Sequence, residues 1–265
     1  MPGVEPELAE DLALIAAAAL AAGEEAMRWF RHDPSVWQKS GGSPVSEADL
    51  AVDRLLSERL TAARPGYGWL SEETADGPER LGRERVFVVD PIDGTRAFLR
   101  GEIEWTVSIA VVQAGRPIVA ALHQPATGKL MTASSGGGAH CAGNRLMVSD
   151  RTRLAGARLG APYKYLERRE IAEQNFAQKR AVPSLALRIA LVADDRLDVA
   201  YGTGNAHDWD LAAADLLVHE AGGRFTNPSG APLLYNKVEP RHEALVAATP
   251  GVYDAARSLL ARLIG

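Results

Sequence analysis

Two patterns of apolar residues divide the chain. Near its start, alanine-rich and leucine-rich stretches are interspersed with charged residues in the manner of amphipathic helices, which we predict over residues 6–31 and 47–63. From residue 86 the apolar residues gather in short runs rich in valine, which predict strands. These strands are VFVVD from residue 86, TVSIAVVQ (106–113), PIVAALHQ (117–124) and KLMTAS (129–134). The letters AGRP between the second and third strands are a hairpin turn signal.

The second half of the chain mixes the two patterns. The glycine-rich stretch GGGAHCAGN (136–144) is expected to break the chain in two. Beyond it we predict strands at 157–161, at RLDVAYG and at 244–249, and helices near 164–178, at 184–193, over DWDLAAADLLVHEAGG and at 250–263. Strands and helices mixed throughout indicate a layered α/β or α+β protein.

Composition narrows the class of protein. The 265 residues are 46% apolar and 24% charged with a net charge of −5, as is ordinary for a soluble globular protein. This balance argues against a basic surface for nucleic acid but allows a small cationic pocket. The single cysteine, Cys141, excludes an intrachain disulfide and a cysteine-based zinc site and favours a reducing cytoplasm. The apolar stretch 12–22 is short and follows acidic residues, so we predict neither a signal peptide nor an anchor.

The motif DPIDGT follows the apolar strand VFVV directly. Its proline and glycine are expected to turn the chain so that Asp90 and Asp93 lie side by side, with the Ile92 carbonyl freed as a third oxygen. Hard oxygen ligands of this kind suit Mg²⁺. If a short helix begins after Gly94, the amides of Gly94 and Thr95 are placed to accept a phosphate. The same letters are also common turn chemistry, in which aspartate caps and glycine supplies a positive φ.

Two further segments place carboxylates at the ends of elements. LSEET carries Glu72 and Glu73, and the helix of DWDLAAADLLVHEAGG begins with Asp208 and Asp210. Acids in a first helical turn are also favoured by the helix dipole alone, which is a purely structural interpretation of Asp210. Taken together with Asp90 and Asp93, the carboxylates at these element ends could hold two Mg²⁺ ions about 4 Å apart for phosphoryl transfer. The chain has neither a GxxxxGK[ST] loop nor a GxSxG elbow.

These segments together resemble the inositol monophosphatase family of Mg²⁺-dependent, lithium-sensitive phosphomonoesterases. Four motifs stand in the family's order: KSGGSPVSEAD (39–49), LSEET (70–74), DPIDGT (90–95) and WDLAAADLLVHEAGG (209–223). The resemblance implies the layered αβαβα sandwich of the inositol monophosphatase and fructose-1,6-bisphosphatase type. It implies an N-terminal half, 1–140, with most metal ligands, and a C-terminal half, 141–265, with Asp210 and the substrate-side residues.

The resemblance also implies a role for each matching residue. Two or three Mg²⁺ ions would be bound by Glu72, Asp90, the Ile92 carbonyl, Asp93 and Asp210. Glu72 and Thr95 would position and activate the attacking water, and Asp49 would act beside Thr95. The phosphate would be met by Asp93, Gly94 and Thr95. On spacing alone, Asp49 could equally serve a capping box with Ser46 at the start of the second helix.

The substrate is the less determined part of the prediction. Inositol-cleaving members usually carry a glutamate seven residues before the WD aspartate, and Thr203 stands at that substrate position here. LSEE, DPIDGTRAF with Arg96, and SLALR (184–188) with Arg188 instead resemble the branch that acts on adenosine 3′,5′-bisphosphate. Arginines would suit a substrate with two phosphates, because a guanidinium binds phosphate in a bidentate manner. Tyr163 is a weaker candidate to bind the base or the second phosphate.

The sequence therefore predicts a 3′(2′),5′-bisphosphate nucleotidase that hydrolyses adenosine 3′,5′-bisphosphate to AMP and phosphate with a metal-activated water. The alternatives are an inositol-1-monophosphatase or a histidinol-phosphatase and, in another class, a non-catalytic partner in a protein or RNA complex. The complete set of expected ligands weighs against a non-catalytic role. We expect a cytoplasmic monomer or homodimer that acts on a small phosphate monoester, without a nucleic-acid polymer or a membrane as partner.

Overall fold

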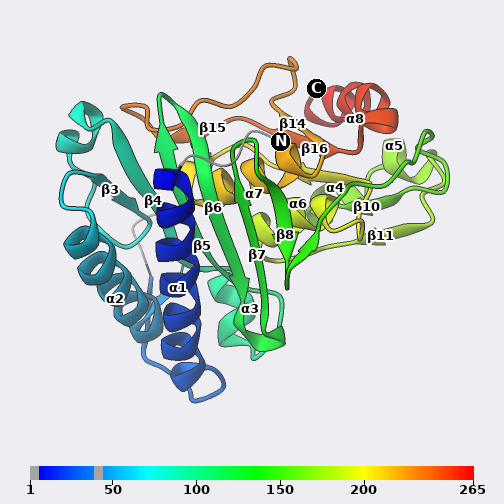
Figure 1. Ribbon diagram of the computed structural model, residues 1–265. Helices are drawn as coiled ribbons and strands as arrows, with labels where there is room; N and C mark the ends of the chain where they lie inside the picture. The colour runs from blue at the N-terminus through cyan, green and yellow to red at the C-terminus, as the bar shows by residue number, and fades with distance from the viewer. Residues whose placement is uncertain (1–5, 39–43) are drawn as a thin grey trace.

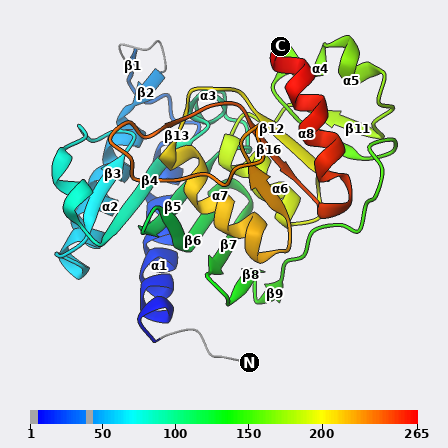
Figure 2. The same ribbon diagram turned by 90° about the horizontal axis from the view of Figure 1, so that it is seen from above.

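The chain folds into alternating layers of helices and sheets, described here from a computed structural model that defines residues 6–38 and 44–265. Helices α1 and α2 cover one face of a large sheet. Helices α6 and α7 fill the space between its other face and a smaller sheet, whose outer side is covered by α8 with α4 and α5 beside it (Figures 1 and 2). This order confirms the αβαβα sandwich. The helices are α1 (Pro6–Trp29), α2 (Glu47–Ala63), α3 (Thr95–Leu99), α4 (Tyr163–Leu166), α5 (Arg169–Ala172), α6 (Leu185–Ala193), α7 (Asp208–Glu220) and α8 (Pro250–Ile264).

Within the described residues the large sheet has seven strands in the order β3-β4-β5-β6-β7-β8-β9. Only β3 and β4 pair in parallel, and every later pair is antiparallel, so the sheet is mostly a meander of hairpins. The strands are β3 (Gly68–Ser71), β4 (Arg85–Asp93), β5 (Thr106–Gln113), β6 (Arg116–Gln124), β7 (Lys129–Ser134), β8 (Gly138–Cys141) and β9 (Asn144–Arg145). The predicted strands at 106–113 and 129–134 and the helix at 47–63 have the observed bounds.

The smaller sheet has the order β11-β10-β12-β16-β14 among the described residues. Its strands are β10 (Arg158–Gly160), β11 (Gln178–Arg180), β12 (Val199–Gly202), β14 (Arg224–Thr226) and β16 (Leu245–Ala248). Two short antiparallel pairs stand apart from both sheets, and both lie near the site described below. They are β1 (Val36–Gln38) with β2 (Pro44–Ser46), and β13 (Ala206–His207) with β15 (Arg241–His242).

Strand β4, the second in the order of its sheet, is buried from end to end because helices cover both faces of that sheet. Successive side chains point to opposite faces of a strand. Phe87 and Val89 accordingly pack with the helices α1 and α2, whereas Val86 and Val88 belong to the core around α6 and α7. A strand covered on both sides needs apolar residues on both faces, which accounts for the unbroken run VFVV.

The predicted break at the glycine-rich stretch 136–144 is wrong. Instead of ending the sheet, these residues form β8, which pairs antiparallel with β7, and the start of β9, which pairs antiparallel with β8. Gly136, Gly138 and Gly143 have positive φ values of 72°, 85° and 79°, so the glycines serve the tight turns of consecutive hairpins. The expected boundary between the two halves at 140/141 thus falls inside β8, and we propose that the halves divide after β9.

The single helix predicted near 164–178 is also wrong. The segment forms the one-turn helices α4 and α5 and then strand β11, which pairs in parallel with β10. Asn175 has a positive φ of 54°, which ends helical geometry before the strand. Among the helices of the described residues, none has the length and apolar character needed to span a membrane.

Candidate active site

A β-bulge at the end of β4 brings Asp90 and Asp93 to the same side of the sheet. Asp90 lies opposite Ser108 and Asp93 opposite Thr106, so three steps along β4 match two along β5. Without the extra residue, positions three apart would face opposite sides of the sheet. The prediction that Pro91 turns the chain is therefore wrong in its geometry, although its consequence, two neighbouring carboxylates, is what the bulge produces.

Gly94 makes the turn that follows the bulge. Its φ of 97° lies in the left-handed region, and it directly precedes the short helix α3. A Cβ atom at this position would stand 3.2 Å from the carbonyl oxygen of Glu104 and 3.3 Å from Cβ of Ser184. The turn therefore requires glycine both for its backbone conformation and for the close approach of two other segments.

The carboxylate of Asp93 is anchored at the N-terminus of α6. The Ser184 hydroxyl donates to its Oδ2, the Ala186 amide donates to the same oxygen at 2.8 Å, and the Leu185 amide donates to Oδ1 at 3.2 Å. Burial raises the pKa of Asp93 to about 6, although these hydrogen bonds act in the opposite direction. The carboxylate is thus fixed in orientation by the C-terminal half of the chain.

Asp90 has a carboxylate oxygen that the protein leaves uncompensated. Its Oδ1 accepts a hydrogen bond from the Ile92 amide at 3.0 Å, but its buried Oδ2 has no hydrogen-bond partner among the described residues. Burial raises the pKa of Asp90 well above its ordinary value, and the neighbouring carboxylates of Glu72, Asp93 and Asp210 raise it further. A buried anionic oxygen without a partner is costly and points to a positive ligand.

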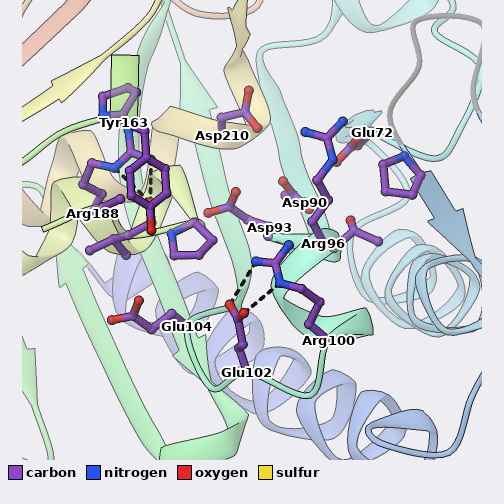
Figure 3. A pocket seen from close by; sticks show the side chains of 17 residues that line it. Glu72, Asp90, Asp93, Arg96, Arg100, Glu102, Glu104, Tyr163, Arg188 and Asp210 are labelled. Carbon is purple, nitrogen blue, oxygen red and sulfur yellow. Dashed lines mark hydrogen bonds and ion pairs between the residues drawn. The ribbon is translucent and has the colours of Figure 1, made fainter. Parts of the chain in front are cut away.

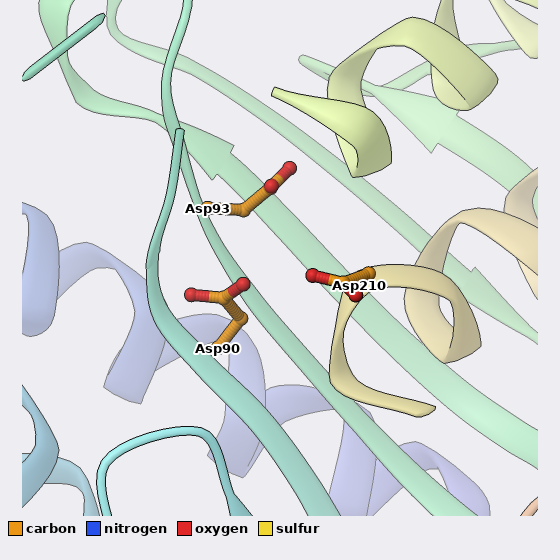
Figure 4. Close-up of side chains that lie close together, drawn as sticks. All are labelled: Asp90, Asp93 and Asp210. Carbon is orange, nitrogen blue, oxygen red and sulfur yellow. The ribbon is translucent and has the colours of Figure 1, made fainter. Parts of the chain in front are cut away.

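Helix α7 contributes the third carboxylate. Asp210 lies in its first turn, and its Oδ2 accepts a hydrogen bond from the His207 amide at 2.6 Å. Ligand oxygens of Asp90, Asp93 and Asp210 lie within 4.8 Å of one another (Figure 4). Hard carboxylate oxygens converging at this distance, one of them orphaned and buried, fit a divalent cation such as Mg²⁺.

Two acidic residues predicted from the sequence stand at the edge of this cluster. Glu72 follows β3, and its amide donates to the Val89 carbonyl at 3.3 Å, so it is registered against β4. Its charge contributes to raising the pKa of both Asp90 and Asp49. Glu72 therefore lies within electrostatic reach of the cluster.

Asp49 makes the contacts of both roles predicted for it, the capping box indicated by its spacing and the place beside Thr95 that the resemblance implies. Its Oδ2 accepts hydrogen bonds from the Ser46 amide at 2.8 Å and the Ser46 hydroxyl at 2.5 Å, which caps α2. Its Oδ1 accepts from Thr95 Oγ1 at 3.2 Å, and Thr95 Oγ1 lies at the same distance from the Ile92 carbonyl oxygen. The buried Asp49 thus links the start of α2 to the turn after β4. Residues 39–43 of the first sequence motif lie outside the described residues.

The carboxylates form one side of a cavity of about 540 Å³ (Figure 3). The sequence-predicted residues that line it are Glu72, Asp90, Asp93, Gly94, Thr95, Arg96, Arg188 and Asp210. Asp49 and Ile92 lie behind this lining, and Thr203, after β12, is half-buried outside it. The structure therefore brings most of the predicted metal-ligand and phosphate residues to one cavity, and Thr203 is not among the residues that line it.

The rest of the lining comes from residues that the sequence motifs indicate weakly or not at all. Arg100 and Glu102 form an ion pair with contacts of 2.7 and 3.0 Å, and Glu104 pairs with Arg180. The exposed Tyr163, a weaker candidate from the sequence, faces the same cavity. Apolar surface comes from Pro162 before α4, from Ala181, Val182 and Pro183 before α6, and from Pro44 in β2. Apart from Tyr163, sequence reasoning missed these residues, and for all but Pro44 their place next to α3, α4 or α6 is the signal that could have indicated them.

Arg188 has a different environment from the one its sequence motif suggests. Its side chain is buried, and its guanidinium donates to the carbonyl oxygens of Val182, at 3.0 and 2.5 Å, and Tyr201, at 3.0 Å. Burial lowers its pKa to about 10. The guanidinium thus fastens the loop before α6, which forms one wall of the cavity.

Comparisons with known proteins agree on one family. The model of the inositol monophosphatase family matches residues 7–262. An inositol-1-monophosphatase of Rhizobium meliloti is 37% identical over 195 residues, 70% of this chain and 73% of the relative. The 3′(2′),5′-bisphosphate nucleotidase CysQ of Aggregatibacter actinomycetemcomitans is 32% identical over 251 residues, 90% and 91% of the two chains. The crystal structure of extragenic suppressor protein SuhB from Bartonella henselae superposes with a TM-score of 0.85 at 29% identity, over 95% of this chain and 98% of that one.

Proposed function

Because this chain belongs to the inositol monophosphatase family, and is accordingly a metal-dependent phosphoric monoester hydrolase, we propose that it is a 3′(2′),5′-bisphosphate nucleotidase. It would hydrolyse adenosine 3′,5′-bisphosphate to AMP and phosphate. The observation that carries this proposal is the composition of one cavity: the carboxylate cluster, Arg96 and a tyrosine- and proline-lined wall share it.

The orphaned Asp90 oxygen and the converging carboxylates support a metal site of two or three Mg²⁺ ions. The residues that would hold the ions are Glu72, Asp90, the Ile92 carbonyl, Asp93 and Asp210. When bound, Mg²⁺ supplies a water of lowered pKa and neutralises charge on the phosphate. The short distances among the carboxylates mean that positive charge there relieves their mutual repulsion as well.

The protein's own groups would orient the reactants for in-line displacement. The Thr95 hydroxyl donates its hydrogen bond to Asp49 or to the Ile92 carbonyl, so the Thr95 oxygen would be able to accept a hydrogen bond from the attacking water. Glu72 would accept the proton of that water. The water oxygen would form the new bond to phosphorus as the ester P–O bond breaks. The leaving alkoxide would take a proton from a solvent water, and the proton held by Glu72 would return to solvent, so that no net proton is gained or lost. The phosphate would lie against Asp93, Gly94 and Thr95.

The remaining wall of the cavity suits a nucleoside as leaving group. Pro162, Tyr163 and Pro183 present apolar surface on which a flat base can stack. Arg96 lines the cavity as well, and we assign a second phosphate to it because a guanidinium binds phosphate in a bidentate manner. The Arg188 guanidinium donates to the backbone carbonyls of Val182 and Tyr201 and would act from the wall of the cavity. A bisphosphorylated adenosine uses both features.

A second substrate class is favoured by the acidic side chains of the same cavity. Glu102 and Glu104 line it, and carboxylates accept hydrogen bonds from an amine or from hydroxyl groups. Histidinol phosphate carries an amine and inositol 1-phosphate carries hydroxyls. The relative from Rhizobium meliloti is named for the second of these activities.

Phosphate release from the purified protein with Mg²⁺ separates these candidates. We expect kcat/KM for adenosine 3′,5′-bisphosphate to exceed that for inositol 1-phosphate and for histidinol phosphate by about 100-fold. A preference of this size is expected because the three leaving groups make different contacts with the cavity. A preference of similar size for either other substrate would contradict the nucleotidase assignment.

Replacing Tyr163 with alanine should impair nucleotide binding selectively. Loss of one base-stacking contact costs about 1–3 kcal/mol, so we expect KM for adenosine 3′,5′-bisphosphate to rise about tenfold or more. Residual hydrolysis of glycerol 2-phosphate, which has no ring, should be unchanged, and Tyr163→Phe should behave as the wild type. Equal losses on both substrates in Tyr163→Ala would show that the ring supports the cavity rather than the base.

A further inference from the structure

The start of helix α7, which carries Asp210, is enclosed by a distant segment of the chain. Asp208, the first residue of the helix, is fully buried, and His242 in β15 is buried beside it. His242 Nε2 lies 2.7 Å from Asp208 Oδ1, and the Asn236 amide donates to Asp208 Oδ2 at 2.6 Å. The Asp208 amide in turn donates to the Pro240 carbonyl at 3.0 Å. Both carboxylate oxygens and the amide of Asp208 are therefore satisfied by residues 236–242.

This enclosure is continuous with the hydrogen bond that holds Asp210. His242 and Arg241 form β15, which pairs with β13 so that His207 lies opposite Arg241. The His207 amide donates to Asp210 Oδ2 at 2.6 Å. Displacement of β15 would thus displace His207 and, through its amide, the Asp210 carboxylate. Arg241 Nε also donates to the His207 ring at 3.2 Å, and that ring stacks on Trp209 with centroids 4.5 Å apart.

The enclosing segment is also attached to the loop that follows Glu72. Arg80 is buried and donates to Asn236 Oδ1 at 2.6 Å and to the Lys237 carbonyl at 2.9 Å. The same guanidinium binds both carboxylate oxygens of Asp76, at 2.6 and 2.8 Å. A continuous set of contacts therefore leads from the loop after Glu72, through residues 236–242, to the start of α7.

We propose that Asp208 and His242 are positioning residues that fix the orientation of Asp210 for a divalent cation. The proposal rests on the proposed function, in which Asp210 is a metal ligand. A buried carboxylate with a buried histidine is expensive to desolvate, and an apolar pair would often be as stable. The directional hydrogen bonds of the pair instead fix the helix start relative to β15, which pairs with β13. Residues that orient a metal-ligating side chain without touching the metal typically contribute about 10–100-fold to metal affinity.

Helix α7 offers a matched control. Asp215, five residues after Asp210, is also fully buried, lies 2.7 Å from the ring of His219 and 3.1 Å from Arg116, and is outside the cavity lining. Asp215→Asn therefore removes a second buried carboxylate from the same helix and leaves the hydrogen bonds of Asp208 to Asn236 and His242 in place. It reports how far a loss of helix stability weakens metal binding.

The test is Mn²⁺ binding to the full chain without substrate, measured by calorimetry or by water-proton relaxation. We expect Asp208→Asn and His242→Ala to weaken Mn²⁺ binding about tenfold or more. His242→Gln, which keeps a donor for Asp208, should restore most of that affinity, and Asp215→Asn should remain within about twofold of the wild type. Unfolding temperatures recorded in parallel identify the variants that are folded, and His242→Gln keeps the test valid if Asp208→Asn does not fold.

Asp210→Asn separates this inference from the function on which it rests. If Asp210→Asn binds Mn²⁺ like the wild type, the proposed metal site itself is wrong. If Asp210→Asn loses affinity while Asp208→Asn and His242→Ala retain it, the metal site stands and the positioning role is overturned. The same holds if Asp215→Asn loses as much affinity as His242→Ala, since the effect would then follow from loss of helix stability.

Discussion

Replacing Asp90 with asparagine is expected to remove activity and at the same time to stabilise the metal-free protein. The Asp90 carboxylate is buried among other acids, and its Oδ2 has no hydrogen-bond partner among the described residues. Asparagine has nearly the same shape, carries no charge and offers a donor to the surrounding carboxylates. We expect kcat/KM to fall about 1,000-fold or more, because a group shared by the proposed metal sites is lost.

The gain in stability distinguishes this account from simple damage to the fold. Removal of an uncompensated buried charge should raise the free energy of unfolding by roughly 1 kcal/mol. For a chain of this size, that gain corresponds to a rise in Tm of about 2–4 °C. Asp198→Asn is the matched control, since that buried carboxylate accepts hydrogen bonds from Ser149 and Arg158 and should lose stability without loss of activity. An Asp90→Asn protein with lowered Tm or with activity above a tenth of the wild type would contradict the expectation.

Gly94→Ala should be the most damaging small substitution in the turn after β4. A left-handed conformation costs an alanine about 1–2 kcal/mol, and the new Cβ would stand 3.2 Å from the Glu104 carbonyl oxygen. The turn must shift, and it carries the neighbours Asp93 and Thr95. Because a displacement of about 1 Å can cost about 100-fold in rate, we expect a loss of that order in kcat.

Gly128→Ala separates the two causes of this effect. Gly128 also has a positive φ, 66°, but nothing lies within 4 Å of the Cβ that alanine would add. It should therefore show the conformational cost in its Tm and keep wild-type kinetics. Comparable losses of kcat in both variants would mean that general destabilisation, and not the geometry of the turn, limits the reaction.

The sequence identified the chemistry well because the site is built from short contiguous motifs. Asp90 and Asp93 stand in one six-residue motif, and Asp210 stands in the first turn of a strongly patterned helix. The layer order that brings α7 to the end of β4 is the one that the family resemblance implies. The long helices and the central strands were similarly evident, since their apolar patterns are dictated by burial on one or both faces.

The parts that sequence could not provide depend on contacts between distant segments. The bulge at β4 is a matter of register against β5, and no local pattern distinguishes it from a turn. The buried state of Arg188 depends on carbonyl oxygens of Val182 and Tyr201. The pairing of Asp208 with His242 joins residues 34 positions apart. Short polar segments such as α4, α5 and β11 lack a clear period, because neighbouring elements rather than their own pattern determine their structure.

The most direct test of the central claim is phosphate release from adenosine 3′,5′-bisphosphate by the wild-type chain after chelation and again after addition of Mg²⁺. We predict that chelation abolishes hydrolysis, that Mg²⁺ restores it, and that Asp90→Asn responds to neither treatment. Hydrolysis that persists in protein shown by elemental analysis to hold no divalent metal would contradict the assignment of the carboxylate cluster as a metal-dependent active site.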